Sequence, residues 1–199
     1  MFNKQNFEVL KACSKEKYKG ILLTQNYSVA TDGSQLIKIT NQKTYPREDY
    51  PVNPAGASVP VVEFTAHIET DDAVRLQKAI PKAKSSMPIL NHLIVEKDEK
   101  ENIVFGTTDL SSWQSISVRK RDNSFPKFEA IISNNAEKKP ILSISVNPER
   151  MANIMTAAKN MGCGIVELRF TSESDSIEMK GQSSDTQQEF YGLLMPMKK

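Results

Sequence analysis

The stretch Tyr191-Gly192-Leu193-Leu194-Met195-Pro196-Met197-Lys198-Lys199 joins an apolar run to a proline. Proline has no N–H to donate to a sheet, so it belongs on a sheet edge or just past a strand end. The residues from Glu189 to Leu194 are therefore predicted to form a final strand. Met195, Pro196 and Met197 are expected to leave the sheet as an apolar tail that rests against the rim of a pocket. The alternative is that these residues fill the core at the edge of a domain.

The elements that precede this strand form a unit of one strand, one helix and three further strands. Residues 141–146 are predicted to form the opening strand, and Asn147 and Pro148 suit the N-cap and first turn of a helix. Gly162 and Gly164 suit the end of that helix. Strands are predicted at 165–170, 176–180 and 189–194. The apolar stripe of the helix, spaced by three and four residues, consists of Met151, Ile154, Met155, Ala158 and Met161.

The same order of elements recurs twice earlier in the chain. A strand is predicted at 61–69, followed by a helix that begins with Thr70 as N-cap and ends at Pro81. Asp71 and Asp72 suit the positive end of that helix. The predicted ranges of its three later strands are 91–96, 102–107 and 113–120. The first copy has a helix at 4–17, strands at 20–24, 27–31 and 35–40, and no clear opening strand, and the proline-rich residues 41–60 form a linker or a long surface loop.

The composition is that of an ordinary globular protein. The chain has 199 residues, with 39% hydrophobic and 25% charged residues and a formal net charge of +2. This near balance does not imply a general attraction to nucleic acid, so any such binding would need a local basic face. Cys13 and Cys163 are too far apart to form a metal or redox motif. No apolar stretch is long enough for a membrane span, and the N-terminus lacks an apolar signal core, so we expect a cytoplasmic protein.

Three stretches resemble the bacterial DNA sliding clamp, the β subunit of DNA polymerase III. The turn Val29-Ala30-Thr31-Asp32-Gly33-Ser34-Gln35-Leu36 is similar to the clamp's Val-Ala-Thr-Asp-Gly-His-Arg-Leu. The stretch Ser124-Phe125-Pro126-Lys127-Phe128-Glu129-Ala130-Ile131-Ile132 is similar to its Phe-Pro-Asp-Tyr interdomain linker. The third stretch is the C-terminal Met195-Pro196-Met197 after a strand. The three occur in the family's order and together span most of the chain.

The resemblance implies an α+β fold built from repeated βαβββ half-units, with antiparallel sheets and the helices on one face. In the family, two half-units make a domain and a chain has six, whereas this sequence has three. Residues 1–122 are expected to form one domain of two half-units, and residues 123–199 a further half-unit. The alternative is a lone half-unit at 1–60 followed by a complete domain at 61–199. The odd half-unit would pair across a two-fold axis with its copy in a second chain, so we expect a homo-oligomer.

Basic residues on the first two predicted helices are the candidate contacts to DNA. In a clamp the helices line the channel, and their lysines and arginines contact phosphate without reading the sequence. The alternative is an ordinary solvated helix face. The candidate residues, which α-helical spacing would place in one row on each helix, are Lys4, Lys11 and Lys15 on the first helix and Arg75, Lys78 and Lys82 on the second.

The resemblance also implies an apolar pocket that takes a short peptide of polymerase or other clamp-binding proteins. Methionine side chains suit a pocket that adapts to several ligands. Ser34 and Gln35 stand where the family has His-Arg, and Ala130 stands where it has Arg, so the preferred peptide can differ. The candidate pocket residues are Thr31, Gly33 and Leu36 in the turn, Pro126 and Ile131 in the linker stretch, and Leu193, Leu194, Met195, Pro196 and Met197 at the C-terminus.

The residue pattern contains no catalytic or metal-binding motif. His67 and His92 lie in predicted strands without an acid or thiol at motif spacing. We therefore expect no enzyme activity and no cofactor. The sequence predicts a sliding-clamp-like processivity factor that tethers polymerase or other partners to duplex DNA. Two alternatives stay open: a clamp-derived adaptor or decoy that binds clamp-interacting peptides without loading on DNA, and an unrelated α+β domain with a small-molecule pocket.

Overall fold

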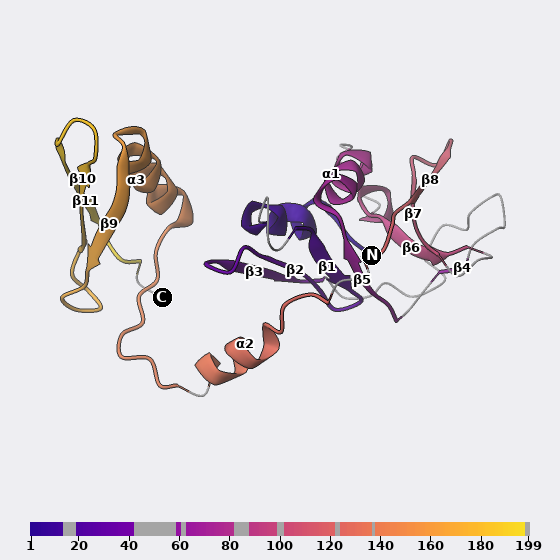
Figure 1. Ribbon diagram of the computed structural model, residues 1–199, viewed down its shortest axis with the longest axis horizontal. Helices are drawn as coiled ribbons and strands as arrows, with labels where there is room; N and C mark the ends of the chain where they lie inside the picture. The colour runs from indigo at the N-terminus through magenta and orange to yellow at the C-terminus, as the bar shows by residue number, and fades with distance from the viewer. Residues whose placement is uncertain are drawn as a thin grey trace. The chain divides into compact units, whose positions relative to one another are not determined.

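The computed structural model describes residues 1–13, 19–41, 59–60, 63–81, 88–98, 102–121, 124–136 and 138–197. The chain divides into two compact units, unit 1 (Met1–Lys127) and unit 2 (Phe128–Lys199). Every strand pair that the structure describes is antiparallel. Few helices accompany these sheets, which confirms the predicted α+β class (Figure 1).

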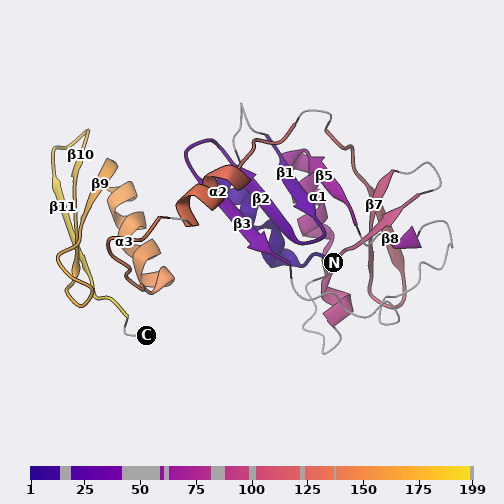
Figure 2. The same cartoon turned by 90° about the horizontal axis from the view of Figure 1, so that it is seen from below.

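Unit 1 contains two four-stranded sheets, in the orders β3-β2-β1-β5 and β4-β6-β7-β8. Figure 2 shows the strands of the first sheet side by side. The strands are β1 (Ile21–Thr24), β2 (Tyr27–Thr31), β3 (Leu36–Thr40), β4 (Val59–Pro60), β5 (Thr65–Ile68), β6 (Ile94–Lys97), β7 (Ile103–Thr108) and β8 (Trp113–Ser117). The helices are η1 (Lys4–Ala12), α1 (Thr70–Ala79) and the short η3 (Pro88–Asn91). Of the predicted linker at 41–60, residues 42–58 lie outside the described part of the chain.

The two halves of unit 1 exchange their opening segments. β5, which opens the second half, pairs with β1 of the first half, from Ile21 opposite Ile68 to Thr24 opposite Thr65. In return Phe2, which precedes η1, bridges to Leu93 just before β6, with N–O distances of 3.0 and 2.7 Å. Phe2 therefore occupies the place of the opening strand that the sequence did not reveal.

Phe2 also joins the two halves through its side chain. The ring is fully buried and lies 6.4 Å from the ring of Phe7, 5.7 Å from that of Phe64 and 6.3 Å from that of Phe105, centroid to centroid. These aromatic contacts come from η1, from the approach to β5 and from β7. A single hydrophobic core thus spans both halves of unit 1.

The first helix is a 3-10 helix, not the α-helix predicted over 4–17. A reciprocal capping box of Asn3 and Asn6 begins η1, and Cys13 ends it with extended backbone angles. In a 3-10 helix, residues three apart lie above one another. The column Asn6, Val9 and Ala12 is buried accordingly. Residues 14–18 of the predicted helix lie outside the described part of the chain.

The second helix, α1, confirms the predicted stop but not the predicted cap. It ends at Ala79, because the residue before Pro81 is disfavoured in helical conformation. The N-cap is Glu69 rather than Thr70. The Thr70 hydroxyl accepts a hydrogen bond from the Gly20 N–H at 3.0 Å, so it ties α1 to the start of β1 instead.

Within its described residues, unit 2 contains a single three-stranded sheet, in the order β11-β10-β9. Asn147 caps α3 as predicted, with its side chain accepting from the Arg150 N–H at 3.0 Å, and Pro148 takes the first turn. The apolar stripe of α3 packs on the sheet around Met179, Phe190 and Leu194. The elements are α2 (Glu129–Ala136), α3 (Pro148–Asn160), β9 (Cys163–Arg169), β10 (Ile177–Ser183) and β11 (Glu189–Leu194).

One prediction for unit 2 was wrong. Residues 141–146 carry no strand: the Met197 N–H donates to the Ser145 carbonyl on one side of this segment, and no described strand pairs with it on the other. The boundary between the two units, after Lys127, falls within the predicted linker stretch at 124–132. The stretch is helical from Glu129 onward, since residues 129–136 contain neither proline nor glycine and begin with an acid, which suits a helix N-terminus.

Candidate functional site

The exposed face of α1 carries the clearest of the predicted basic residues. Its opposite face buries Ala73 and Leu76 in the core of unit 1, which fixes the helix and turns Arg75 and Lys78 outward. Residues three apart on a helix are neighbours, so these two cations lie side by side. Lys82 of the predicted row lies outside the described residues.

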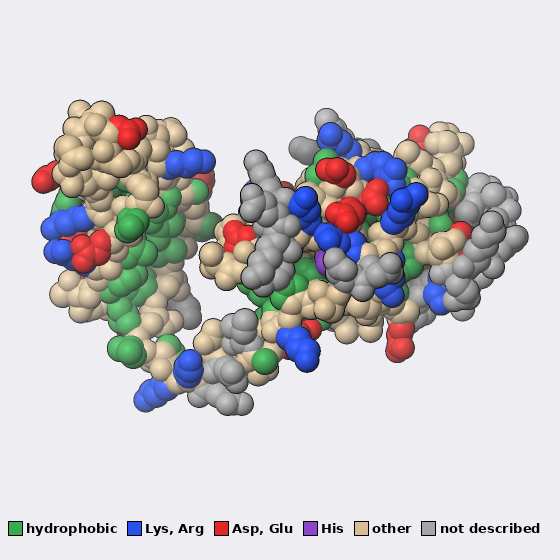
Figure 3. Space-filling view, viewed as in Figure 1, with side chains coloured by type: hydrophobic (Ala, Val, Ile, Leu, Met, Phe, Trp, Pro, Cys, Tyr) green, Lys and Arg blue, Asp and Glu red, His purple; other side chains and the backbone are tan. Residues whose placement is uncertain are grey.

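Arg75 is held in place by two contacts. Its guanidinium forms an ion pair with Asp72 at 2.9 Å and donates to the Ser117 carbonyl at 2.6 Å. The Asp72 carboxylate partly offsets the arginine charge. Figure 3 shows acidic side chains among the basic ones in the region of α1. Within the described residues, no ion pair forms at Lys78, so this ammonium group keeps its charge available.

An open groove lies between α1 and β8. Its volume is about 700 Å³, and Arg75, Lys78, Gln114, Ser115 and Ser117 line it together with Ala79 and Ile116. The lining thus combines two cations with hydroxyl and amide groups. Such groups bind phosphate oxygens without discriminating between bases.

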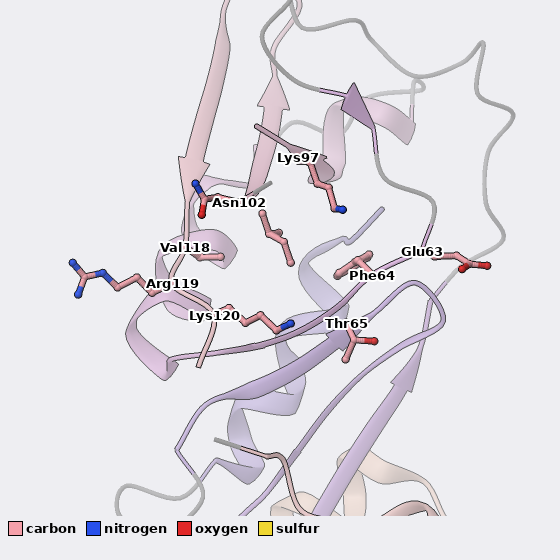
Figure 4. Close-up of a pocket in the computed structure, with 9 residues that line it drawn as sticks. Glu63, Phe64, Thr65, Lys97, Asn102, Val118, Arg119 and Lys120 are labelled. Atoms are coloured by element: carbon pink, nitrogen blue, oxygen red, sulfur yellow. The ribbon is translucent and has the colours of Figure 1, made fainter. Parts of the chain in front are cut away.

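A second hollow extends the basic surface past the end of β8 (Figure 4). Its volume is about 590 Å³, and its lining includes Lys97, Arg119 and Lys120. Figure 4 shows Lys97 and Lys120 pointing inward and Arg119 pointing away. These residues are absent from the predicted DNA contacts, which comprised basic residues on helices only. The run Val118-Arg119-Lys120-Arg121 was the available signal.

The predicted basic row on the first helix does not form. Lys4 and Lys11 are seven residues apart, which on an α-helix would align them, but a 3-10 helix turns about 120° per residue and separates them by about 120°. Lys11 also pairs with Glu8 at 2.6 Å. Lys15 lies outside the described residues.

The turn that carries Thr31, Gly33 and Leu36 is tightly hydrogen-bonded. The Thr31 hydroxyl donates to the Gln35 carbonyl at 2.7 Å and accepts from the Gly33 N–H at 3.0 Å. The Asp32 carboxylate accepts the backbone N–H groups of Gln35 and Ser34, which lowers the pKa of this exposed carboxyl. Gly33 has φ 95°, a left-handed conformation that favours glycine. Leu36 follows as the first residue of β3, half-buried.

The other predicted pocket residues lie in the linker stretch and at the C-terminus. Pro126 is half-buried, and Ile131 belongs to α2. Leu194 is buried in the core of unit 2, whereas Leu193 is exposed. Met195 and Met197 are 60% and 53% exposed, so they do not fill the core. Pro196 lies between them and is half-buried.

The C-terminal tail is fixed by its backbone. The Met197 N–H donates to the Ser145 carbonyl at 2.8 Å. Of the predicted pocket residues, Thr31, Gly33, Leu36 and Pro126 belong to unit 1 and the others to unit 2. As a binding site the pocket stays a prediction.

The histidines occupy structural positions in unit 1. The His67 ring lies 3.0 Å from the Lys19 carbonyl and stacks edge-on against Phe125 at 5.2 Å. His92 is buried beside η3. No group of three or more potential metal ligands occurs among the residues that the structure describes. No helix in the described ranges is long and apolar enough to span a membrane.

Comparison with known proteins supports the fold through structure alone. No protein-family model and no curated protein matches the sequence. A crystal structure of the DNA polymerase III beta chain from Streptococcus pneumoniae TIGR4 matches with a TM-score of 0.58 and 13% identity. The match covers 99% of this chain and 48% of that chain, so this chain spans about half the length of the protein it resembles. The chain therefore has a clamp-like fold.

Proposed function

We propose that this chain is a sliding-clamp-like processivity factor that holds duplex DNA and tethers polymerase or other partner proteins to it. The observation that carries the proposal is the likeness of nearly the whole chain to a DNA polymerase III beta chain. In this proposal the protein is not an enzyme and acts in the cytoplasm. Its contribution is to keep other proteins on DNA.

The half-units divide between two bodies in this proposal. Residues 1–122 form one clamp domain of two half-units, and residues 123–199 carry the third. The pairing of β1 with β5 and of Phe2 with Leu93 supports this division, because each joins the first half-unit to the second. A boundary near residue 60 would separate strands that share one sheet.

DNA contact in this proposal is electrostatic. Arg75 and Lys78 line one groove, and Lys97, Arg119 and Lys120 line the neighbouring hollow together with Glu63. When lysines and arginines of the protein bind DNA phosphates, they displace the counterions condensed on the DNA. The affinity for DNA therefore falls as the salt concentration rises and barely depends on the base sequence. The net charge of +2 makes such a local surface necessary.

Charge reversal on α1 tests this proposal. The double variant Arg75→Glu with Lys78→Glu should weaken binding about equally on unrelated duplexes. Each lost phosphate contact should reduce the slope of log affinity against log salt by about 0.9. The matched control is Lys138→Glu with Lys139→Glu, the same charge change at two exposed residues of unit 2. Equal losses in both double variants would contradict a DNA site at α1.

The clamp-derived adaptor is the second candidate. It is favoured by the pairing of Arg75 with Asp72 and of Lys11 with Glu8, which removes charge from the helices proposed to face DNA. An adaptor would bind clamp-interacting peptides without loading on DNA. Fluorescence anisotropy with a labelled duplex and a labelled clamp-binding peptide separates the two. Peptide binding without salt-sensitive DNA binding would establish the adaptor.

A further inference from the structure

Unit 1 shows how two half-units of this chain cover each other. β5 runs along β1, and the Ile21 to Thr24 residues of β1 are all buried. Just beyond β8, the Arg121 N–H donates to the His67 carbonyl of β5 at 2.7 Å. The opening strand therefore has two neighbours, the closing segment of its own half and the first strand of the other half.

Unit 2 repeats only one of these two contacts. The Met197 N–H donates to the Ser145 carbonyl, as Arg121 does to His67, and Ser145 and His67 both lie two residues before a helix N-cap. Residues 141–146 have no strand on their other side within the described residues. Among the described strands, β9 pairs with β10 alone.

Two glycines mark equivalent places in the two units. Gly20 and Gly162 have φ +94° and +83°, and each directly precedes the first strand after a helix. At Gly20 an added Cβ would lie 2.1 Å from the Ile68 carbonyl oxygen of β5. At Gly162 the nearest atom would be the Ser183 Oγ at 3.2 Å, so the place that β5 fills in unit 1 is open here.

The open edge lacks charged residues over its first four positions, whereas Glu167 and Arg169 follow in its second half. Edge strands are commonly shielded by charged residues. The first half of β9, residues 163–166, is uncharged, as is the whole of 141–146. Ile165 is 83% exposed, and Figure 3 shows hydrophobic side chains gathered over β9 and α3. The edge at β11 differs from the edge at β9, because the strands equivalent to β11 in unit 1, β3 and β8, also lie at sheet edges.

We propose that a second copy of this chain covers β9. Residues 141–146 of each copy pair antiparallel with β9 of the other, about a two-fold axis, as β5 pairs with β1 within unit 1. By the equivalence of Ile21 with Cys163 and of Ile68 with Val146, Val146 of one copy lies opposite Cys163 of the other. The contact is reciprocal, so two chains complete it and no edge of this kind remains. This inference concerns assembly and does not depend on DNA binding.

Sedimentation of the full chain without DNA tests the association. The wild type should sediment at micromolar concentration with twice the mass of the 22.3 kDa chain. Ile165→Lys should be a monomer, since a charge at an exposed edge opposes strand addition. Leu193→Lys is the matched control on β11, also exposed, and should remain a dimer. A monomeric wild type, or an Ile165→Lys variant that remains a dimer, would overturn the proposal.

Disulfide trapping tests the register. Opposed residues of antiparallel strands have Cα atoms about 4.5–5.5 Å apart, which is within reach of a disulfide. Cys13→Ser removes the competing thiol, and Val146→Cys in that background places a thiol opposite the native Cys163 of the second copy. Mild oxidation should give a covalent dimer on a non-reducing gel, and Cys13→Ser alone should not. Failure to cross-link while a dimer sediments would overturn the proposed pairing.

Discussion

β1 and β9 occupy the same place in their half-units but differ fully in burial. Each follows a helix and a glycine with positive φ, and each pairs on one side with the next strand of its half. All four residues of β1 are buried, whereas none of the seven in β9 is. The difference follows from β5, which covers the outer edge of β1. The burial of β1 thus depends on a neighbouring half-unit as well as on its apolar sequence.

The largest effect is expected when each of the two equivalent glycines, Gly20 and Gly162, is replaced by alanine. Gly20→Ala forces a Cβ against the Ile68 carbonyl at 2.1 Å and a left-handed backbone on alanine. We expect a loss of about 2–4 kcal/mol in the free energy of unfolding, from overpacking and from the left-handed conformation. Gly162→Ala meets only the Ser183 Oγ, so about 1–2 kcal/mol is expected for the backbone alone.

The single tryptophan separates the two effects. Trp113 lies in β8 of unit 1, so its fluorescence in urea reports the unfolding of that unit. Gly20→Ala should lower the midpoint of the fluorescence transition, and Gly162→Ala should leave it unchanged while lowering the transition seen by circular dichroism in unit 2. If both variants lose equal stability, contact with β5 is not what distinguishes the two strands. Gly162→Ala should also weaken the proposed dimer, where a second copy lies against this residue.

The sequence predicted the local elements of both units but not which of them pair. Asn147 as N-cap, Pro81 as helix stop and the turn at Asp32 to Ser34 were right, because each depends on residues within a few positions. The strand at 141–146 was wrong, because a strand depends on its pairing partners and no described strand pairs with this segment.

Non-local packing also explains the other misses. Phe2 serves as an opening segment through one bridge to Leu93, too short to leave an alternating pattern. The row of Lys4 and Lys11 assumed α-helical spacing, which the 3-10 geometry of η1 removes. For the candidate site, Arg75 and Lys78 could be predicted from their spacing on one helix. Lys97 and Lys120 are far apart in the sequence, and only the pairing of the strands brings them to the same hollow.

A smaller effect is expected at the closing segments of the two units. Deleting residues 195–199 removes the hydrogen bond from Met197 to Ser145, which should cost about 1 kcal/mol in unit 2. Met195 and Met197 are exposed, so the fold should survive, and binding of a clamp-type peptide should be lost. The shorter deletion of Lys198 and Lys199 keeps this bond and serves as the control.

Circular dichroism and peptide anisotropy measure these two outcomes. The tryptophan transition of unit 1 should not move in either deletion, because Trp113 lies in unit 1. Unfolding of unit 2 by the longer deletion would mean that the tail is part of its core. Retained peptide binding would remove the C-terminal tail from the proposed pocket.

The strand turns give a finer comparison between halves. Thr31 and Thr108 make the same contacts in their turns, each donating to the carbonyl four residues later at 2.7 Å. Where the first turn has Gly33, the second has Leu110 with φ 73°, an unfavourable angle for leucine. Leu110 is exposed, so Leu110→Gly should stabilise unit 1 by up to about 1 kcal/mol, the strain relieved less the added chain entropy. A lowered tryptophan midpoint in urea would contradict this expectation.

The smallest effect concerns Asp109 in the second of these turns. The hydroxyl and N–H groups of Ser111 and Ser112 lower the pKa of this exposed carboxyl from 3.8 to about 2. Because the folded state binds the proton less tightly than the unfolded state, the charged carboxylate stabilises the fold above about pH 4, and this contribution disappears as the pH falls toward 2. Asp109→Asn should therefore lower the urea midpoint of the tryptophan transition at pH 7, and the difference from wild type should shrink below pH 4. Asp185→Asn in the β10–β11 turn, followed by circular dichroism because it lies in unit 2, is the control, since that carboxylate accepts a long hydrogen bond of 3.4 Å from its neighbour Ser184. A difference at Asp109 that stays constant from pH 7 to pH 2 would show that the amide is a poorer fit for the turn and that the carboxylate charge plays no part.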